Sequence, residues 1–202
     1  AEICESCNIT FIGPSAEVIR TMGDKNTARA TATANGVPVT PGSDGIVADA
    51  VEGLKVAKEV GFPVMIKATA GGGGRGMRPA MSEDEFKSQF QAASKEAEAC
   101  FNNGDCYIEK LVLEPHHIEF QVLADDHGNY FHLGERDCSM QRRNQKIIEE
   151  CPSPLISPEM RERMGEASVR LIESISYRNA GTIEYLVNAD ATDFYFMEMN
   201  TR

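Results

Sequence analysis

A glycine-rich stretch in the first half of the chain has the composition of a phosphate-binding loop. The apolar run Val64–Ile66 predicts a buried strand that ends at Lys67, and glycine occupies five of the six positions 71–76. Backbone N–H groups of glycine can approach an anion closely, because no Cβ intervenes and a positive φ costs little. Lys67 and Arg75 would add positive charge. A Walker A loop does not fit, because no Gly-Lys-Ser/Thr follows, and a dinucleotide fingerprint does not fit, because the residues from Met77 read as extended and not as a helix. We therefore expect a flap over a phosphate, with an ordinary hairpin tip as the alternative.

Two glutamates near the end of the chain predict a divalent-cation site. If residues 182–188 and 194–200 pair around a five-residue loop, Glu184 lies directly opposite Glu198, and Asn200 follows on the same face. Carboxylates about 5 Å apart at their Cβ atoms repel each other unless a cation separates them. Carboxylate and amide oxygens suit Mg²⁺ better than zinc. In a different strand register, one glutamate would lie in water instead.

A basic segment, residues 139–146, interrupts an otherwise acidic chain. The sequence has 20 Lys and Arg against 31 Asp and Glu, a net charge of −11, so its average field repels nucleic acids and acidic membranes. A cluster of positive charge in such a chain either binds a specific anion or is a solvated surface. Lys25, at the start of a predicted helix, allows the same two interpretations.

Length and composition are those of a globular protein of one or two domains. The chain has 202 residues, of which 42% are hydrophobic, and it contains no apolar run near the roughly 20 residues of a membrane span. Six cysteines without a secreted-scaffold pattern favour a reducing compartment. The lone Cys4-Glu5-Ser6-Cys7 motif lacks a second cysteine pair, so zinc is not the favoured interpretation.

Periodicity and capping residues predict a sheet with one apolar and one polar face. The strand 117–124 alternates strictly, with Ile118, Phe120 and Val122 on the core face and His117, Glu119 and Gln121 on the other. A compact strand and helix alternation between about 38 and 111 indicates a small lid inserted into a larger α+β domain. Ser15 and Asp24 can cap the first two helices. Helices are expected at 15–22, 25–34, 47–57, 82–100 and 158–177, and strands at 9–12, 37–40, 64–67, 106–112, 117–124, 130–135, 147–148, 182–188 and 194–200.

Seven motifs, in order along the chain, resemble those of biotin carboxylase: Met22-Gly23-Asp24-Lys25, Val64-Met65-Ile66-Lys67-Ala68, Gly71-Gly72-Gly73-Gly74-Arg75-Gly76-Met77, Tyr107-Ile108-Glu109-Lys110, Gly134-Glu135-Arg136-Asp137-Cys138-Ser139-Met140-Gln141-Arg142-Arg143, Gly181-Thr182-Ile183-Glu184 and Phe196-Met197-Glu198-Met199-Asn200-Thr201-Arg202. The resemblance covers essentially the whole chain. It implies an ATP-grasp fold with an inserted glycine-flap lid at about 38–111. Residues 1–22 would then end a preceding α/β N-terminal domain, and residues 23–202 would form an ATP-grasp domain truncated at its C-terminal side.

The resemblance implies a function as well. Members of the family carboxylate biotin on a carrier protein, using ATP and bicarbonate through carboxyphosphate, with Mg²⁺ or Mn²⁺. This is the first half-reaction of enzymes such as acetyl-CoA carboxylase in fatty acid synthesis. The implied partners are a biotin carboxyl carrier protein or domain, a carboxyltransferase component and a second copy in a full-length homodimer, with no nucleic acid or membrane. The implied location is the cytoplasm or the plastid stroma.

The site residues implied by the resemblance extend along most of the chain. Glu184, Glu198 and Asn200 correspond to Mg²⁺ ligands, in agreement with the hairpin argument. Lys146 corresponds to a bicarbonate-site lysine, and Arg202 to an arginine that steadies negative charge. Asn144 departs from the family's usual His, although plastid and cyanobacterial-type members often carry Asn. The implied ATP contacts are Lys25, Lys67, Gly72, Gly73, Gly74, Met77, Glu109, Lys110, Val112, His117, Gln141, Asn144 and Leu186.

Other interpretations remain open from the sequence. In the family a Gln-Val-Glu segment after the position of Arg202 holds bicarbonate and supplies the general base, and a later arginine binds biotin; we expect both to belong to a longer parent chain. A carbamoyl-phosphate synthetase-like ligase would share the flap and the carboxylates but lack the Ser139–Arg143 run. A third possibility is a fragment that binds ATP without completing catalysis. The parent could be an acetyl-CoA carboxylase subunit or the first domain of a propionyl-, methylcrotonyl- or pyruvate carboxylase chain.

Overall fold

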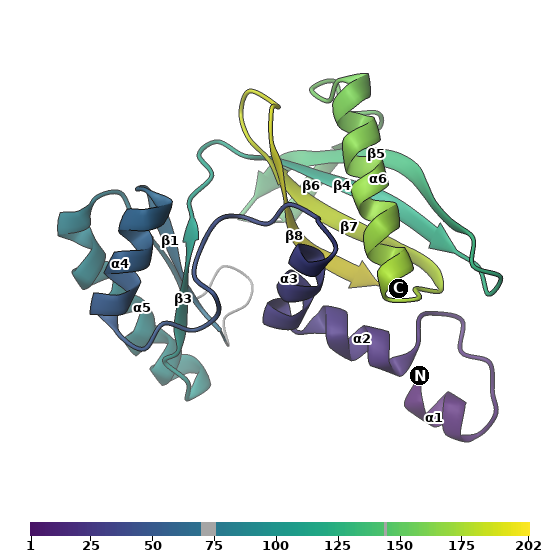
Figure 1. The fold of residues 1–202 in the computed structure, drawn as a ribbon, viewed down its shortest axis with the longest axis horizontal. Helices are drawn as coiled ribbons and strands as arrows, with labels where there is room; N and C mark the ends of the chain where they lie inside the picture. The colour runs from purple at the N-terminus through teal and green to yellow at the C-terminus, as the bar shows by residue number, and fades with distance from the viewer. Residues whose placement is uncertain (70–75, 144) are drawn as a thin grey trace. The chain divides into compact units, whose positions relative to one another are not determined.

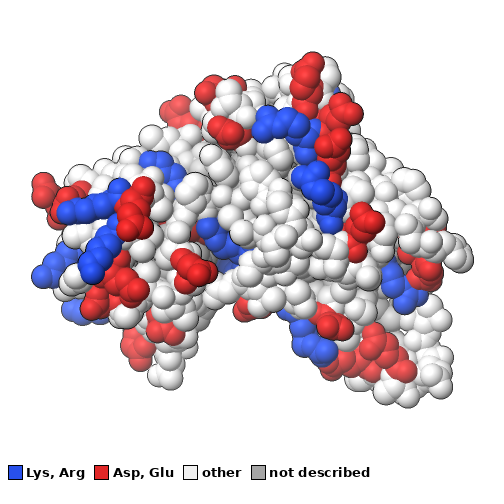
Figure 2. All heavy atoms as spheres, viewed as in Figure 1, with Lys and Arg blue, Asp and Glu red and all other residues white. Residues whose placement is uncertain are grey.

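A computed structural model describes residues 1–69, 76–143 and 145–202 and divides the chain into two compact units (Figure 1). The first unit contains residues 1–39 and 113–202, and the second contains residues 40–112. Both are built on antiparallel sheets with helices, so the predicted α+β class is confirmed. Over the face shown in Figure 2, Lys and Arg side chains are interspersed with Asp and Glu. Within the described ranges, no helix has the length and apolarity needed to cross a membrane.

The first unit is a five-stranded sheet covered on one face by a long helix. The strand order is β6-β5-β4-β7-β8. The predicted alternation is confirmed, because Ile118, Phe120 and Val122 are fully buried beneath α6 (Pro158–Ser174), which lies across the sheet in Figure 1. The opposite face is therefore left to the polar residues of the same strands. The strands are β4 (His116–Ala124), β5 (Tyr130–Arg142), β6 (Gln145–Glu150), β7 (Asn179–Val187) and β8 (Phe194–Thr201).

Three helices precede this sheet in the sequence: α1 (Glu2–Ser6), α2 (Ala16–Gly23) and α3 (Lys25–Ala34). The predicted caps are confirmed, because Ser15 Oγ accepts from the N–H of Val18 at 3.2 Å and Asp24 Oδ1 accepts from that of Thr27 at 2.8 Å. The predicted strand at 9–12 is wrong. That segment is irregular, and Ile12 is 84% exposed, because β-branched residues form a strand only where a neighbouring strand completes the hydrogen bonds. The predicted strand at 37–40 is reduced to one bridge, Val39 to Phe196.

The second unit is a three-stranded sheet with two helices on one face. Its strand order is β2-β1-β3, with β1 (Val64–Ala68), β2 (Met77–Ala80) and β3 (Cys106–Lys110). Ile66 and Ile108 pack with Phe86 beneath α4 (Ala50–Val60) and α5 (Glu83–Phe101), so Lys67 lies on the other face. The segment before α4 runs beside β3 so closely that a Cβ at Gly42 would lie 2.2 Å from the carbonyl oxygen of Ile108. Only glycine fits there.

An ion pair joins α6 to the sheet of the first unit. Arg161 Nε donates to both carboxylate oxygens of Glu135 at 2.8 Å, and its second nitrogen donates to Oε1 at 2.6 Å. Glu135 is only 2% exposed. Burial alone would raise the pKa of Glu135, but the hydrogen bonds from Arg161 outweigh it and lower that pKa.

We expect Arg161→Met to lower the free energy of unfolding by about 3 kcal/mol or more, because it leaves a buried carboxylate without its partner. Urea denaturation would measure the loss. Arg170→Met is the matched control, since Arg170 lies on the same helix and reaches Glu166 only at 3.9 Å at the surface; it should change stability by no more than about 0.5 kcal/mol. Equal losses in both variants would contradict the proposed contribution of the buried pair.

Candidate functional site

The sheet face opposite α6 holds three glutamates side by side. Strand pairing aligns Glu119 on β4 with Glu184 on β7, and Glu184 in turn with Glu198 on β8. The predicted pairing of Glu184 with Glu198 is therefore confirmed. Beside the loop the predicted register is wrong by one residue, since Val187 pairs with Phe194, and a β-bulge between Glu184 and Tyr185 makes up the difference. The next row along these strands consists of Gln121, Thr182 and Asn200.

Glu184 is the centre of the hydrogen-bond network on this face. Its Oε1 accepts from Lys146 Nζ at 2.9 Å and from Asn200 Nδ2 at 2.8 Å, while its Oε2 lies 2.5 Å from His117 Nε2. Burial alone would raise the pKa of Glu184, which is 5% exposed, but the hydrogen bonds from His117 and Lys146 lower that pKa to about 2. The Glu184 side chain is therefore a carboxylate at neutral pH.

Lys146 bridges two of the three glutamates. Its Nζ donates to Glu119 Oε2 at 2.5 Å as well as to Glu184. Glu119, only 4% exposed, also accepts from Arg136 Nε at 2.6 Å. Partial burial would lower the pKa of Lys146, but its two carboxylate partners raise it. The sequence placed Glu119 on the polar face but assigned it no role; its position within a strictly alternating strand was the available signal.

His117 is held through both ring nitrogens. Gln141 Nε2 lies 2.6 Å from Nδ1 of His117 and donates to the carbonyl oxygen of Cys138 at 2.8 Å. Because an amide NH₂ can only donate, Nδ1 is the acceptor and Nε2 carries the proton directed at Glu184. The resemblance implied His117 and Gln141 as neighbours near the nucleotide, and the structure brings the two side chains together.

Glu198 differs from the other two glutamates of its row. Its side chain is half-buried, and no hydrogen bond or ion pair of this side chain occurs within the described residues. The amide of Asn200 directs its NH₂ toward Glu184, which leaves the amide oxygen available. A carboxylate without a cationic partner beside an amide oxygen is a donor set that fits Mg²⁺.

The second unit positions a different group of predicted residues. Lys67 on β1 forms an ion pair with the buried Glu109 of β3, and Met77 of β2 lies directly opposite Lys67 in the sheet. Lys110 Nζ donates to the carbonyl oxygens of Gly61 and Phe62 at 2.9 Å each, so its side chain binds the segment that follows α4. Val112 follows β3 and is half-buried.

The remaining predicted residues lie at element ends or outside the described ranges. Lys25 is the exposed first residue of α3, Leu186 lies two residues after Glu184 on β7, and Arg202 follows β8. Four predicted ATP contacts, Gly72, Gly73, Gly74 and Asn144, lie outside the residues that the structure describes, as does Arg75.

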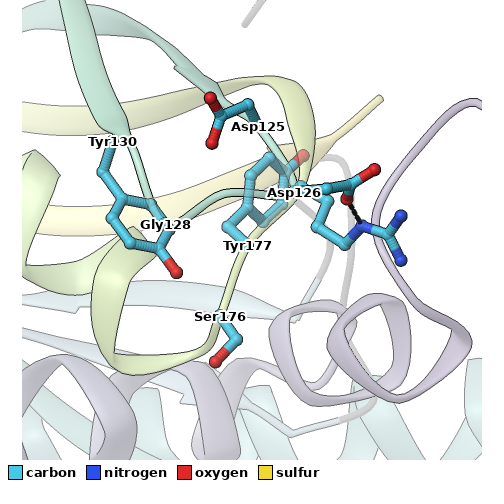
Figure 3. Close-up of a pocket in the computed structure, with 7 residues that line it drawn as sticks. Asp125, Asp126, Gly128, Tyr130, Ser176 and Tyr177 are labelled. Carbon is cyan, nitrogen blue, oxygen red and sulfur yellow. Dashed lines mark ion pairs between the residues drawn. The ribbon is translucent and has the colours of Figure 1, made fainter.

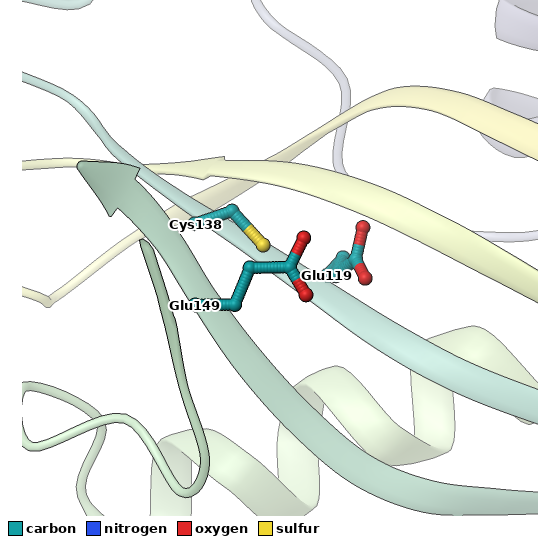
Figure 4. A group of neighbouring side chains, drawn as sticks. All are labelled: Glu119, Cys138 and Glu149. Carbon is teal, nitrogen blue, oxygen red and sulfur yellow. The ribbon is translucent and has the colours of Figure 1, made fainter. Parts of the chain in front are cut away.

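Glu119, Cys138 and Glu149 each place a potential metal-ligand atom within 4.8 Å of the others (Figure 4). Both carboxylate oxygens of Glu119 already accept hydrogen bonds from Arg136 and Lys146. Burial, together with the nearby Glu119 carboxylate, raises the pKa of Cys138 to about 12. Because metals bind the thiolate, this group is a poor metal site at neutral pH.

A pocket of about 380 Å³ lies in the first unit, between the β4–β5 turn and the segment after α6 (Figure 3). Asp126 forms an ion pair with Arg178, and Asp125 accepts hydrogen bonds from its own turn, from the backbone N–H groups of His127 at 2.8 Å and Asn129 at 2.9 Å. The carboxylates of Asp125 and Asp126 and the guanidinium of Arg178 are thus paired within the chain, so they offer a ligand no unpaired charge.

Comparison with known proteins gives consistent matches. The family model for the carbamoyl-phosphate synthase L chain ATP-binding domain matches residues 24–202. The chain is 58% identical over 202 residues to a biotin carboxylase of Nostoc sp., covering all of this chain and 45% of that protein. It is 57% identical over 201 residues to the chloroplastic biotin carboxylase 1 of Populus trichocarpa, covering all of this chain and 38% of that protein. The chain thus spans less than half the length of these relatives.

Solved structures agree with these matches. The biotin carboxylase of Campylobacter jejuni, solved as a β-γ-ATP complex, matches with a TM-score of 0.89 and 50% sequence identity. The match covers all of this chain and 45% of the Campylobacter chain. The biotin carboxylase domain dimer of the Hydrogenobacter thermophilus 2-oxoglutarate carboxylase, solved with MgADP, ADP and bicarbonate, has a TM-score of 0.89 and 50% identity over all of this chain and 44% of its own.

Proposed function

Because the chain belongs to the family of the carbamoyl-phosphate synthase L chain ATP-binding domain, and biotin carboxylases match it from end to end, we propose that its parent enzyme carboxylates biotin. The reaction would use ATP and bicarbonate through carboxyphosphate. The observation that carries the proposal is the row Glu119, Glu184 and Glu198 with Lys146 bound across it. It brings together an acidic donor set and a fixed cation, as a reaction between a metal nucleotide and an anion requires.

Glu198, Asn200 and Glu184 would hold Mg²⁺ on this face. When bound, the ion would neutralise phosphate oxygens and orient the γ-phosphoryl group. Glu184 would have to exchange its contact with Lys146 for the metal. Glu119 gives Lys146 a second buried carboxylate, so the lysine keeps a partner after that exchange.

Lys146 would serve as a positive charge for bicarbonate rather than as a base. Its pKa is raised by the two carboxylates, so the ammonium group stays protonated throughout the neutral range. It can attract bicarbonate and stabilise charge on the oxygens of a carboxyphosphate without taking up a proton. Arg202, which follows β8, would add a second cation for the same anion.

We propose residues 40–112 as the lid of this enzyme. The ammonium group of Lys67 would contact ATP phosphates, and its ion pair with Glu109 fixes it on the sheet face away from α4 and α5. Glu109, Lys110, Val112 and Met77 would contact the adenine. Gly72, Gly73 and Gly74 would cover the phosphates and exclude water, which matters because an acyl phosphate hydrolyses readily.

The implied partners and location are part of the proposal. They are a biotin carboxyl carrier protein or domain, a carboxyltransferase component and a second copy of the parent enzyme. Bacterial and chloroplastic relatives support a location in the cytoplasm or the plastid stroma. Acetyl-CoA carboxylase is the parent that we favour, since relatives named biotin carboxylase are 57% to 58% identical to this chain.

The test is ATP turnover by the complete parent polypeptide. We expect ADP release to require bicarbonate and to rise severalfold with free biotin, because biotin consumes the carboxyphosphate that would otherwise hydrolyse. Omitting bicarbonate is the internal control. Turnover that depends on ammonia and ignores biotin would instead indicate a carbamoyl-phosphate synthetase-like ligase. Nucleotide binding without turnover would indicate a binding protein.

A further inference from the structure

The hydroxyl group of Thr182 is buried without a hydrogen bond inside the candidate site. Thr182 is 3% exposed, and no partner for its Oγ1 occurs within the described residues. It lies on β7 between Gln121 of β4 and Asn200 of β8. Ile183 and Tyr185 belong to the core face, so Thr182 shares the polar face with Glu184.

The neighbouring amides leave this hydroxyl without a partner, and most of their hydrogen-bonding groups are bound elsewhere. Gln121 Nε2 donates to the carbonyl oxygen of Gly181 at 2.9 Å, and its Oε1 accepts from Arg136 at 3.2 Å. Asn200 Nδ2 donates to Glu184 at 2.8 Å. The Thr182 hydroxyl and the Asn200 amide oxygen are therefore the polar atoms of this row that still lack partners within the described residues.

A buried polar group without a partner is destabilising, and native proteins rarely keep one without a reason. Here the hydroxyl lies one row from Glu198, whose carboxylate has no cationic partner within the described residues and would repel an anion. The same negative charge attracts a cation together with its bound water, and Mg²⁺ usually keeps several of its waters.

We propose that the Thr182 hydroxyl binds a water molecule in the hydration shell of the divalent cation held by Glu198 and Asn200. Thr182 would thus be a positioning residue for the metal, through its water, in addition to the carboxylate ligands. The inference rests on the proposed metal site and adds a residue to it. It predicts that the hydroxyl matters to metal affinity and that the shape of the side chain does not.

The test compares Thr182→Val, which keeps the shape and removes the hydroxyl, with Thr182→Ser, which keeps the hydroxyl. The probe is Mn²⁺ with ADP added to the 202-residue chain, with free Mn²⁺ counted by electron paramagnetic resonance. We expect Thr182→Val to weaken Mn²⁺ binding about 5- to 10-fold, the effect of one lost hydrogen bond, and Thr182→Ser to stay within about twofold of the original chain. Without metal, Thr182→Val should raise the melting temperature by about 2–4 °C, because the unsatisfied hydroxyl is gone.

The outcomes distinguish an error in the role of Thr182 from an error in the proposed metal site. If the original chain binds Mn²⁺ with ADP and Thr182→Val binds it equally well, the role of Thr182 is wrong while the metal site stands. If the valine variant is no more stable without metal and is unchanged in affinity, an ordinary water satisfies the hydroxyl, and the inference is again wrong. If the original chain binds no Mn²⁺ in the presence of ADP, both the metal site and the role of Thr182 are overturned.

Discussion

Replacing Glu198 by glutamine should lower the affinity for Mg²⁺ with nucleotide by about 10- to 100-fold and leave the folded protein intact. The reason is that Glu198 contributes the carboxylate of its row that lacks a cationic partner within the described residues. An amide oxygen is a weaker ligand than a carboxylate because it carries no net charge. Thermal-shift curves with and without Mg²⁺ and ATP would measure both quantities.

The stability of Glu198→Gln tests whether Glu184 and Glu198 repel each other in the absence of metal. The sequence alone predicts that folding stays intact or is slightly stabilised, because two facing carboxylates repel each other without metal. The structure reduces that expectation, since Lys146 already balances the charge of Glu184 and His117 donates a hydrogen bond to it. We therefore expect a change in unfolding free energy of no more than about 0.5 kcal/mol. Ligand-induced stabilisation equal to that of the original chain would contradict the shared metal site.

Replacing Glu184 by glutamine should instead destabilise the protein by about 2–3 kcal/mol even without metal. Lys146 and Asn200 donate to one oxygen of Glu184, and the Nε2 proton of His117 points at the other. A glutamine amide has one acceptor oxygen and one donor NH₂, so one of these contacts becomes donor against donor in a buried place. Lys146 also loses one of its two carboxylate partners.

Urea denaturation at neutral pH without metal would measure this loss. Glu162→Gln, an exposed glutamate on α6, is the matched control and should change stability by no more than about 0.5 kcal/mol. A Glu184→Gln variant as stable as the original chain would show that the network around Glu184 contributes nothing to the fold. Metal binding should still be lost in that case, so the role of Glu184 in stability can be separated from its role as a metal ligand.

Much of the fold could be predicted from local patterns. Strict alternation in residues 117–124 predicted which side chains enter the core, and Ile118, Phe120 and Val122 are fully buried. Ser15 and Asp24 predicted two helix starts, because their side chains satisfy backbone N–H groups of the first turn. The strand predicted at residues 9–12 failed for the opposite reason: a strand needs a partner, and β propensity alone does not supply one.

The sequence by itself predicted that Glu184 and Glu198 face each other, from a hairpin with a five-residue loop and a period of two. In the structure a β-bulge completes this pairing, because beside the loop the strands pair one residue out of that register, with Val187 opposite Phe194. The tertiary structure alone decided which residues compensate these charges. Lys146 on β6 reaches Glu119 on β4 and Glu184 on β7 only because the chain folds into the strand order β6-β5-β4-β7-β8. Periodicity tells which face of a strand a residue occupies, but it does not tell which distant strand lies beside it. The charge state of Lys146, the role of Glu119 and the unsatisfied hydroxyl of Thr182 all depend on those neighbours.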